Sequence, residues 1–170
     1  MEQKNTHVKW GLISGVLMVG ITIALQLGGL DQKSFLGWLA YLPFVVGIIL
    51  NAMAFSKAND GFVTFKNVFG SGFKASMIVT LLMIVWSVIY IYAFPEMKEK
   101  AIEMARAEMA KKPNMTDEAM DMGINIFRKG YTTIIISGAL FGTLVMGVIF
   151  SLIGAGVAPK KGERPITDNF

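Results

Sequence analysis

The chain has 170 residues and a net charge of +4, with 54% hydrophobic and only 16% charged residues. Ordinary soluble domains are about 45–50% apolar and about 25% charged, so this composition argues against a soluble globular protein. Cysteine is absent, which excludes disulfides and thiolate chemistry, and no arginine–aromatic cluster points to a nucleic-acid partner.

Four long apolar segments follow one another along the chain. They cover about 10–30, 35–55, 75–94 and 131–158, and none contains Asp, Glu, Lys, Arg or His. About 20 helical residues cover the ~30 Å hydrocarbon core of a bilayer. A bilayer offers no water to backbone groups, so such segments are helices. We therefore predict an all-α, polytopic membrane protein in which residues 1–170 form one membrane domain with four transmembrane helices.

The first two segments each carry one local expectation. The apolar run of the first is longer than the ~7–15 residues of a secretory signal, so we expect an uncleaved helix. Pro43 lies inside the second segment, where its missing N–H and its ring predict a kink.

Residues 59–76, NDGFVTFKNVFGSGFKAS, separate the second and third spans. Thr64 can cap a helix that begins one residue later. At helical spacing the phenylalanines form one stripe: Phe62, Phe65, Phe69 and Phe73. Lys66 flanks this stripe and can extend toward headgroups. We predict an interfacial amphipathic helix over about 62–73, whose stripe and Lys66 contact lipid or a partner. A re-entrant segment is the alternative, and it would require partners for Lys66 and Asn67 at depth.

The segment of about 96–129 before the fourth span is rich in charge. It holds seven of the 16 Lys and Arg residues and seven of the 12 Asp and Glu residues. Pro113 should end a first helix, and Thr116 should cap a second one. The second helix has an apolar face that leads into the fourth span. We predict an extramembrane helical hairpin or bent helix that rests partly on the bilayer surface.

Small residues on two spans predict close helix packing. They are Gly11 and Gly15 in the first span and Gly138, Gly142 and Gly147 in the fourth. Packing within the bundle is one interpretation, and dimerisation or docking to a partner is the other.

Chemically active residues are scarce within the spans. Their polar residues are Gln26, Asn51, Thr80, Ser87, Ser137, Thr143 and Ser151, with a few others near the ends. We interpret them as partners in helix–helix or backbone hydrogen bonds. Membrane proteases, transferases and proton-coupled carriers need ionisable groups at membrane depth. The many methionines of 96–129 have no Cys or His beside them, which favours apolar contact over copper binding. We therefore expect no catalytic residues, no metal, no cofactor and no enzymatic activity.

Lysines near the span ends indicate an orientation. The first connecting loop holds one lysine, the second holds three, and two more follow the fourth span directly. Positive charge in short loops marks the cytoplasmic side, so we expect both termini in the cytoplasm. We expect the polar tail after Ala158 to be frayed.

The stretch GFVTFKNVFGSGF, Gly61–Phe73, resembles a family pattern, Gly-x-hydrophobic-Thr/Ser-Phe-x-x-x-Phe-x-x-Gly-Phe. The pattern lies between the second and third helices of a bacterial family catalogued as domain of unknown function 4199. The four spans, the closing YIYAFPEM of the third span (Tyr90–Met97) and the charged segment before the fourth are also similar. The resemblance covers nearly the whole chain. It implies a bacterial inner-membrane protein and carries no activity or catalytic residue with it.

The leading expectation is a non-enzymatic accessory or interaction subunit of the inner membrane. Its partners would be membrane lipids and either a second copy of the chain or another membrane protein. One alternative is a small oligomeric transporter or channel, in which Gln26, Asn51, Ser87 and Thr143 would line a polar path. The other is a lipid- or membrane-sensing protein that uses the phenylalanine-rich helix.

Overall fold

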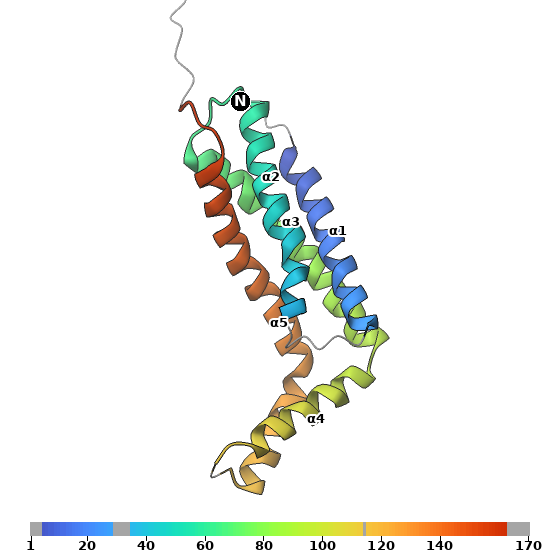
Figure 1. The fold of residues 1–170 in the computed structure, drawn as a ribbon. Helices are drawn as coiled ribbons and strands as arrows, with labels where there is room; N and C mark the ends of the chain where they lie inside the picture. The colour runs from blue at the N-terminus through green and yellow to red at the C-terminus, as the bar shows by residue number, and fades with distance from the viewer. Residues whose placement is uncertain (1–4, 29–34, 114, 163–170) are drawn as a thin grey trace, which may run out of the picture.

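The computed structural model describes residues 5–28, 35–113 and 115–162, and these are helical apart from short connections (Figure 1). The elements are α1 (Thr6–Leu27), a 3-10 helix η1 (Phe35–Tyr41), α2 (Leu42–Ala58), α3 (Phe65–Ala93), α4 (Glu96–Ala110) and α5 (Asp117–Val157). Four stretches are long and apolar enough to cross a membrane: Thr6–Gln26, Phe35–Ala58, Phe65–Ala93 and Asp117–Val157. The predicted all-α fold with four such helices is confirmed.

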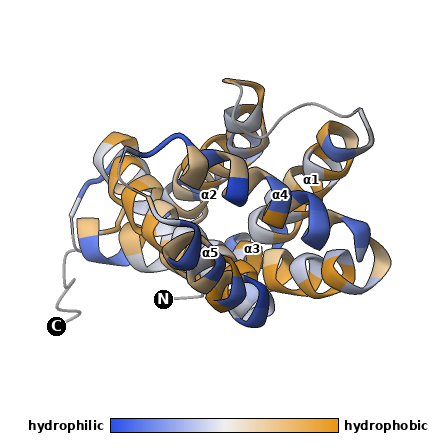
Figure 2. Cartoon of the chain, turned by 90° about the horizontal axis from the view of Figure 1, so that it is seen from below, coloured by the Kyte–Doolittle hydropathy of each residue, from blue (hydrophilic) through white to orange (hydrophobic). Residues whose placement is uncertain are grey.

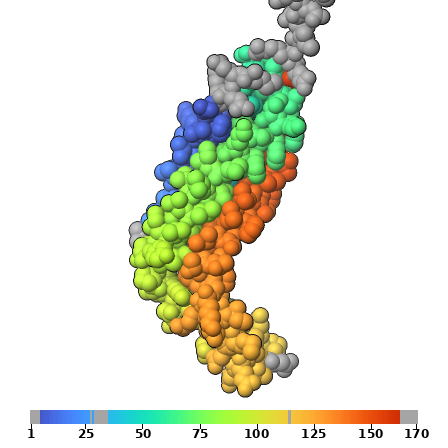
Figure 3. Space-filling model, turned by 180° about the vertical axis from the view of Figure 1, so that it is seen from behind, coloured from blue at the N-terminus to red at the C-terminus, as the bar shows by residue number. Residues whose placement is uncertain are grey.

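The four long helices run alternately up and down in one bundle. The start of α1, the connection between α2 and α3, and the end of α5 lie together at one end, which we call the loop end (Figure 1). The end of α1, the start of η1 and the end of α3 lie at the opposite end. From there α4 and the first part of α5 project as a pair, so we call it the hairpin end. Figure 3 shows α3 along the back of the bundle between α1 and α5.

Hydrophobic residues occur throughout the helices of the bundle (Figure 2), and many of their side chains are exposed. Large outward-facing examples on four helices are Val16, Leu42, Leu81 and Phe141, each more than half exposed. A bundle in water would carry polar residues on those faces. The outer surface therefore suits a hydrocarbon solvent.

The core consists of two hydrophobic clusters stacked along the bundle. The cluster in the middle of the bundle contains Met18, Phe44, Ile48, Ala75, Val79 and Phe150. Its two phenylalanine rings meet edge to face with centroids 5.2 Å apart, a favourable aromatic geometry. The cluster beneath the loop end contains Ala52, Val63, Val68, Ala155 and Ala158.

Three of the five glycines singled out in the sequence lie at helix contacts. A Cβ on Gly11 would lie 2.8 Å from the Ala75 carbonyl oxygen of α3. A Cβ on Gly15 would overlap the side chain of Leu82, also on α3. A Cβ on Gly147 would lie 2.6 Å from both side-chain atoms of Ser76. Glycine permits these close approaches because it has no side chain.

The other two glycines, Gly138 and Gly142, take no part in packing among the described helices. Both are exposed, and no atom lies within 4 Å of the position of an added Cβ. The reason is the five-residue step from Gly142 to Gly147. At about 100° per residue it turns Gly142 roughly 140° away from the packed face.

Pro43 starts a helix rather than bending one, which corrects the expected kink. The second span begins as the 3-10 helix η1 and becomes α-helical at Leu42, with Pro43 in the first turn of α2. In that turn the backbone N–H has no partner within the helix, so a proline costs little there.

Both later spans are longer than a bilayer requires. The segment expected as an interfacial helix forms the first turns of α3, which continues without interruption for 29 residues. The fifth helix has 41 residues, or about 60 Å at 1.5 Å per residue. About half of α5 is therefore enough to cross a bilayer, and the rest extends beyond the hairpin end.

Candidate functional site

A reciprocal capping box builds the start of α3 at the loop end. The Thr64 hydroxyl oxygen accepts from the Asn67 backbone N–H at 3.3 Å, and the Asn67 side-chain oxygen accepts from the Thr64 backbone N–H at 3.1 Å. Two donors that lack helical partners are satisfied in this way. The helix start predicted at Phe65 is confirmed, and it positions the aromatic residues that follow.

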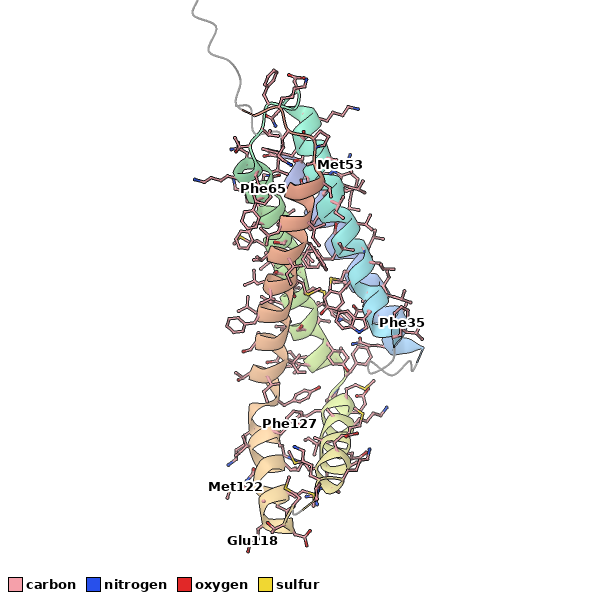
Figure 4. The ribbon with its side chains drawn as sticks, turned by 60° about the vertical axis from the view of Figure 1, so that its left-hand side comes forward. Phe35, Met53, Phe65, Glu118, Met122 and Phe127 are labelled. Carbon is pink, nitrogen blue, oxygen red and sulfur yellow. The ribbon has the colours of Figure 1, made fainter. Side chains whose placement is uncertain are left out.

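The four phenylalanines of the predicted stripe do not share one environment. Phe65 is exposed at the loop end, beside exposed Lys66 (Figure 4). Phe69 and Phe73 are half-buried and stack with centroids 6.1 Å apart. Phe62 precedes the helix, and its ring lies 5.3 Å from the Lys161 ammonium nitrogen. Phe65, at 46% exposure, is the one exposed member of the four.

The chain segment after α5 folds back over the loop between α2 and α3. The Lys161 N–H donates to the Gly61 carbonyl at 2.7 Å, and the Ser56 hydroxyl donates to the Pro159 carbonyl. Lys160 donates to carbonyls at the end of α5, including Ala155 O at 2.5 Å and Ala158 O at 2.7 Å. The frayed tail expected after Ala158 is therefore corrected for residues 159–162. The Lys161–Gly61 and Ser56–Pro159 bonds join positions about 100 residues apart, which no local sequence signal reports.

One group of buried polar residues, drawn from α2, α3 and α5, lies toward the loop end. The Asn51 amide donates to the Ser71 hydroxyl oxygen at 3.1 Å, and Ser151 packs against Gly72. Asn51 and Ser151 are 0% and 1% exposed. Their Oδ1 and Oγ atoms have no hydrogen-bond partner among the described residues. The Asn51–Ser71 bond ties α2 to α3.

Most other buried hydroxyls bond to the backbone of their own helix. Ser87 and Thr143 donate to the carbonyls of Met83 and Ala139. Gln26 lies at the hairpin end, on the last turn of α1, whereas Asn51 lies toward the loop end. The four residues considered for a polar path are therefore not brought together at one place.

The projecting hairpin consists of α4 packed antiparallel on the first part of α5. Thr116 accepts from the Ala119 N–H at 3.2 Å and caps α5, as predicted. The interface between the two helices buries Ile102 and Ile124, at 4% and 6% exposure. Tyr131 closes it beside Phe127, with ring centroids 6.0 Å apart.

Two ion pairs bridge the hairpin at separate levels. Arg106 Nη2 lies 2.5 Å from Asp121 Oδ1, and Arg128 Nη2 lies 3.0 Å from Glu99 Oε2. Exposed pairs such as these contribute about 0–1 kcal/mol each. The buried isoleucines therefore supply most of the stability, and the ion pairs help to set the register of the two helices.

The outer face of the hairpin displays large apolar side chains. Met122 and Ile126 are four residues apart on one side of α5 and are 68% and 66% exposed. Figure 4 shows Met122 on the side of α5 away from α4, whereas Phe127 lies between the two helices. Met104 on α4 is half exposed. Within the ranges that the structure describes, no group of three or more His, Cys, Asp and Glu side chains could hold a metal ion.

Comparison with known proteins then decides the family. A family model described as "Protein of unknown function (DUF4199)" matches residues 9–160. The chain belongs to this family. The match covers the loop end, all four long helices and the hairpin, so the resemblance noted at Gly61–Phe73 is confirmed. No curated protein and no solved structure matched the chain. The DUF4199 description assigns no activity.

Proposed function

We propose that this protein is a non-enzymatic accessory or interaction subunit of a membrane assembly, with the α4–α5 hairpin as its docking element. The observation that carries the proposal is the exposed apolar pair Met122 and Ile126 on a helix that projects beyond the bundle. Complete burial of a side chain of this size contributes about 1.5–3 kcal/mol. The pair can therefore anchor a partner of modest affinity.

The charges of the hairpin suit a polar rim around that apolar contact. The segment 96–129 carries seven basic and seven acidic residues, so its net charge is zero. Protein interfaces typically combine an apolar centre with a polar edge. Methionine adds an adaptable contact surface. A protein partner fits these features better than a nucleic acid or an anionic surface does.

The buried polar groups support a role without catalysis. In the part of the chain that the structure describes, the buried polar side chains are those of Ser, Thr and Asn, together with the phenol of Tyr131. Such groups form hydrogen bonds between helices, whereas acid–base catalysis uses groups that titrate near the working pH.

Photo-crosslinking in native membranes tests the docking role. A benzophenone amino acid replaces Met122 or Ile126, and the control positions are Lys112 on the hairpin and Leu81 on the outer face of the bundle. We expect one discrete protein adduct from each of positions 122 and 126. When the crosslinker is at position 122, the substitution Ile126→Asp should weaken this adduct. Adducts that are equal at all four positions, or only with lipid, would contradict the proposal.

The loop end supports a second candidate, a role in sensing lipid composition. Exposed Phe65 and Lys66 lie together on the first turn of α3, and other lysines at the same end include Lys57, Lys74 and Lys161. An aromatic residue beside cations suits an amphipathic surface at the headgroups. We expect phosphatidylglycerol in nanodiscs to raise the melting temperature, and Phe65→Ser with Lys66→Gln to reduce that increase. An unchanged increase would remove this candidate.

We also propose a location in the bacterial inner membrane, with both termini in the cytoplasm and the hairpin outside. The support is the lysine content of the loop end, since positive loops remain on the cytoplasmic side. A cysteine at position 118 should then react with a membrane-impermeant maleimide on spheroplasts. Protection of that cysteine until lysis would reverse the orientation.

A further inference from the structure

A pocket of about 370 Å³ lies between the last turns of α1, the 3-10 helix η1 and the middle of α3. We propose that it binds a single-chain amphiphile with an uncharged, hydroxyl- or carbonyl-bearing head. This proposal is independent of the docking role of the hairpin. It rests on the depth of the pocket, its hydrogen-bonding groups and the uncharged side chains of its described walls.

The pocket extends from the surface of the protein into its core. Trp38, at its outer side, is 63% exposed, and Met18, at its inner side, is 2% exposed. Met18 belongs to the central hydrophobic cluster, against which Met83 and Tyr41 also pack. Gly37 and Ala40 on η1 contribute little side-chain volume to the wall. A hydrocarbon chain that enters beside Trp38 therefore reaches methionine side chains, which adapt to irregular apolar shapes.

Three hydrogen-bonding side chains line the same pocket: Gln26, Trp38 and Tyr41. None of the three side chains makes a hydrogen bond to another residue in 5–28, 35–113 or 115–162. A fourth residue, Thr22, donates its hydroxyl to the Met18 carbonyl at 2.8 Å and keeps its lone pairs as acceptors. The Gln26 side chain is partly exposed, so its amide is accessible to a ligand in the pocket. The Gln26 amide both donates and accepts, so it matches a head that carries a hydroxyl or a carbonyl.

The lining and the position of the pocket define the ligand class further. No Asp, Glu, Lys, Arg or His among the described residues lines the pocket, so its described walls offer no counterion to a charged head. The tilted ring pair of Trp38 and Tyr41, with centroids 5.8 Å apart, is of the kind found where hydrocarbon meets headgroups. Small-molecule pockets typically measure about 300–1,000 Å³ and combine apolar walls with a few polar groups. This pocket has the size and the lining for a small neutral head followed by part of a hydrocarbon tail.

Quenching of Trp38 fluorescence tests the proposal in the full-length protein. The background variant Trp10→Phe/Trp86→Phe retains Trp38 as the one tryptophan, in nanodiscs of dioleoyl phosphatidylcholine. The probe is a dibromostearoyl monoacylglycerol, whose bromines quench tryptophan at short range. We expect quenching to saturate at low mole fraction. A second background, Trp38→Phe/Trp86→Phe, retains Trp10 at the loop end. Its quenching should rise in proportion to the mole fraction of the probe, without saturation.

Two variants locate the site within the Trp38 background. Gly37→Leu fills the pocket and should remove the saturating component; Gly37 has no positive φ, so its backbone accepts a side chain. The matched control, Gly20→Leu, adds the same side chain to an exposed position with no atom within 4 Å and should leave quenching unchanged. Gln26→Leu should weaken binding of the probe by roughly three- to tenfold, the loss expected for one or two uncharged hydrogen bonds.

Several outcomes would overturn the proposal. Proportional quenching of Trp38, as for Trp10, would mean that no site exists. Saturation that survives Gly37→Leu in a variant that still elutes as a single folded species would place the site elsewhere. Equal saturation by a dibromostearoyl phosphatidylcholine would mean that the pocket takes bulk lipid and does not select an uncharged head.

Discussion

At Gly147, α5 approaches α3 so closely that the two Ser76 side-chain atoms would lie 2.6 Å from an added Cβ. Ser76 cannot easily move away, because it is fully buried and donates its hydroxyl to the Phe73 carbonyl. Gly47 on α2 meets Ser14 on α1 in a similar way, since a Cβ there would overlap the serine hydroxyl. Single missing side chains therefore determine how close these helices lie.

The substitution Gly147→Ala should destabilise the bundle by about 1–3 kcal/mol, because the added methyl group overpacks a rigid contact. Gly138→Ala is the matched control on the same helix. It should be neutral or stabilising by up to about 1 kcal/mol, since alanine favours the helix and its methyl group meets nothing. Unfolding of the purified protein by SDS in mixed micelles measures both. Equal effects would show that Gly147 is not a closest-approach position.

The Asn51–Ser71 hydrogen bond makes a second prediction at the level of residues. Ser71→Ala removes the acceptor and leaves the buried Asn51 amide without its one described partner. We expect a loss of about 0.5–2 kcal/mol in the same unfolding assay. Ser87→Ala should change little, because the Ser87 hydroxyl donates to the Met83 carbonyl of its own helix and so does not tie two helices together. A larger effect of Ser87→Ala than of Ser71→Ala would contradict this interpretation.

At the level of elements, the segment after α5 and the α2–α3 loop support each other. Gly61 has φ of +81°, a conformation that favours glycine. Its carbonyl accepts from Val63 as well as from Lys161. The loop therefore depends on a partner from the far end of the chain, and the end of α5 is held to the start of α3.

Deletion of residues 159–170 should open this loop. It removes the Pro159 and Lys161 backbone bonds, so hydrogen exchange at residues 59–63 should accelerate and proteases should cleave there. Deletion of 163–170 alone is the control and keeps both bonds. Equal exchange at 59–63 in the two truncated proteins would show that residues 159–162 do not stabilise the loop.

At the level of the whole molecule, alternating helices place the loop end and the hairpin end at opposite ends of the bundle, so a bilayer that the bundle crosses would separate them. Asn5 and Lys57 lie at the loop end, and Glu118 lies at the tip of the hairpin (Figure 4). Between Lys57 and Glu118 the chain passes from the loop end to the hairpin end through one long helix, α3. This relation follows from the fold and does not depend on which side is cytoplasmic.

Single cysteines report this arrangement directly, because the chain has none of its own. In sealed vesicles, Asn5→Cys and Lys57→Cys should react with an impermeant maleimide from one side, and Glu118→Cys from the other. All three positions are exposed, so reactivity should depend on the side alone. Labelling of positions 57 and 118 from the same side would contradict a membrane crossing by α3.

Several helix boundaries were predictable because their signals are local. Thr64 and Thr116 cap helices at the predicted residues, since a cap depends on a side chain and a backbone group three residues away. The kink predicted at Pro43 is wrong because a proline suits a first turn as well as a kink, and only the observed start of α2 distinguishes the two.

The candidate surfaces were predictable only in part. The sequence indicates a hairpin before the fourth span, but it does not indicate which side of α5 contacts α4 and which side exposes Met122 and Ile126. The pocket beside Trp38 has no sequence signal, because its walls come from α1, η1 and α3 and meet only through packing. The same holds for the bond between Lys161 and Gly61.

Composition and length by themselves determined that the chain forms four helices fit for a bilayer, because hydrocarbon accepts only long uncharged segments with satisfied backbones. Only the tertiary structure decided which faces of those helices meet. In a water-soluble bundle the apolar face is the inner face, but here Gly138 faces outward and Gly147 faces inward on one equally apolar helix. Lipid tails and helix cores are alike in polarity, so polarity does not distinguish the inward faces from the outward faces. The faces differ in how closely they fit a neighbouring helix, and this fit is defined only when the helices pack.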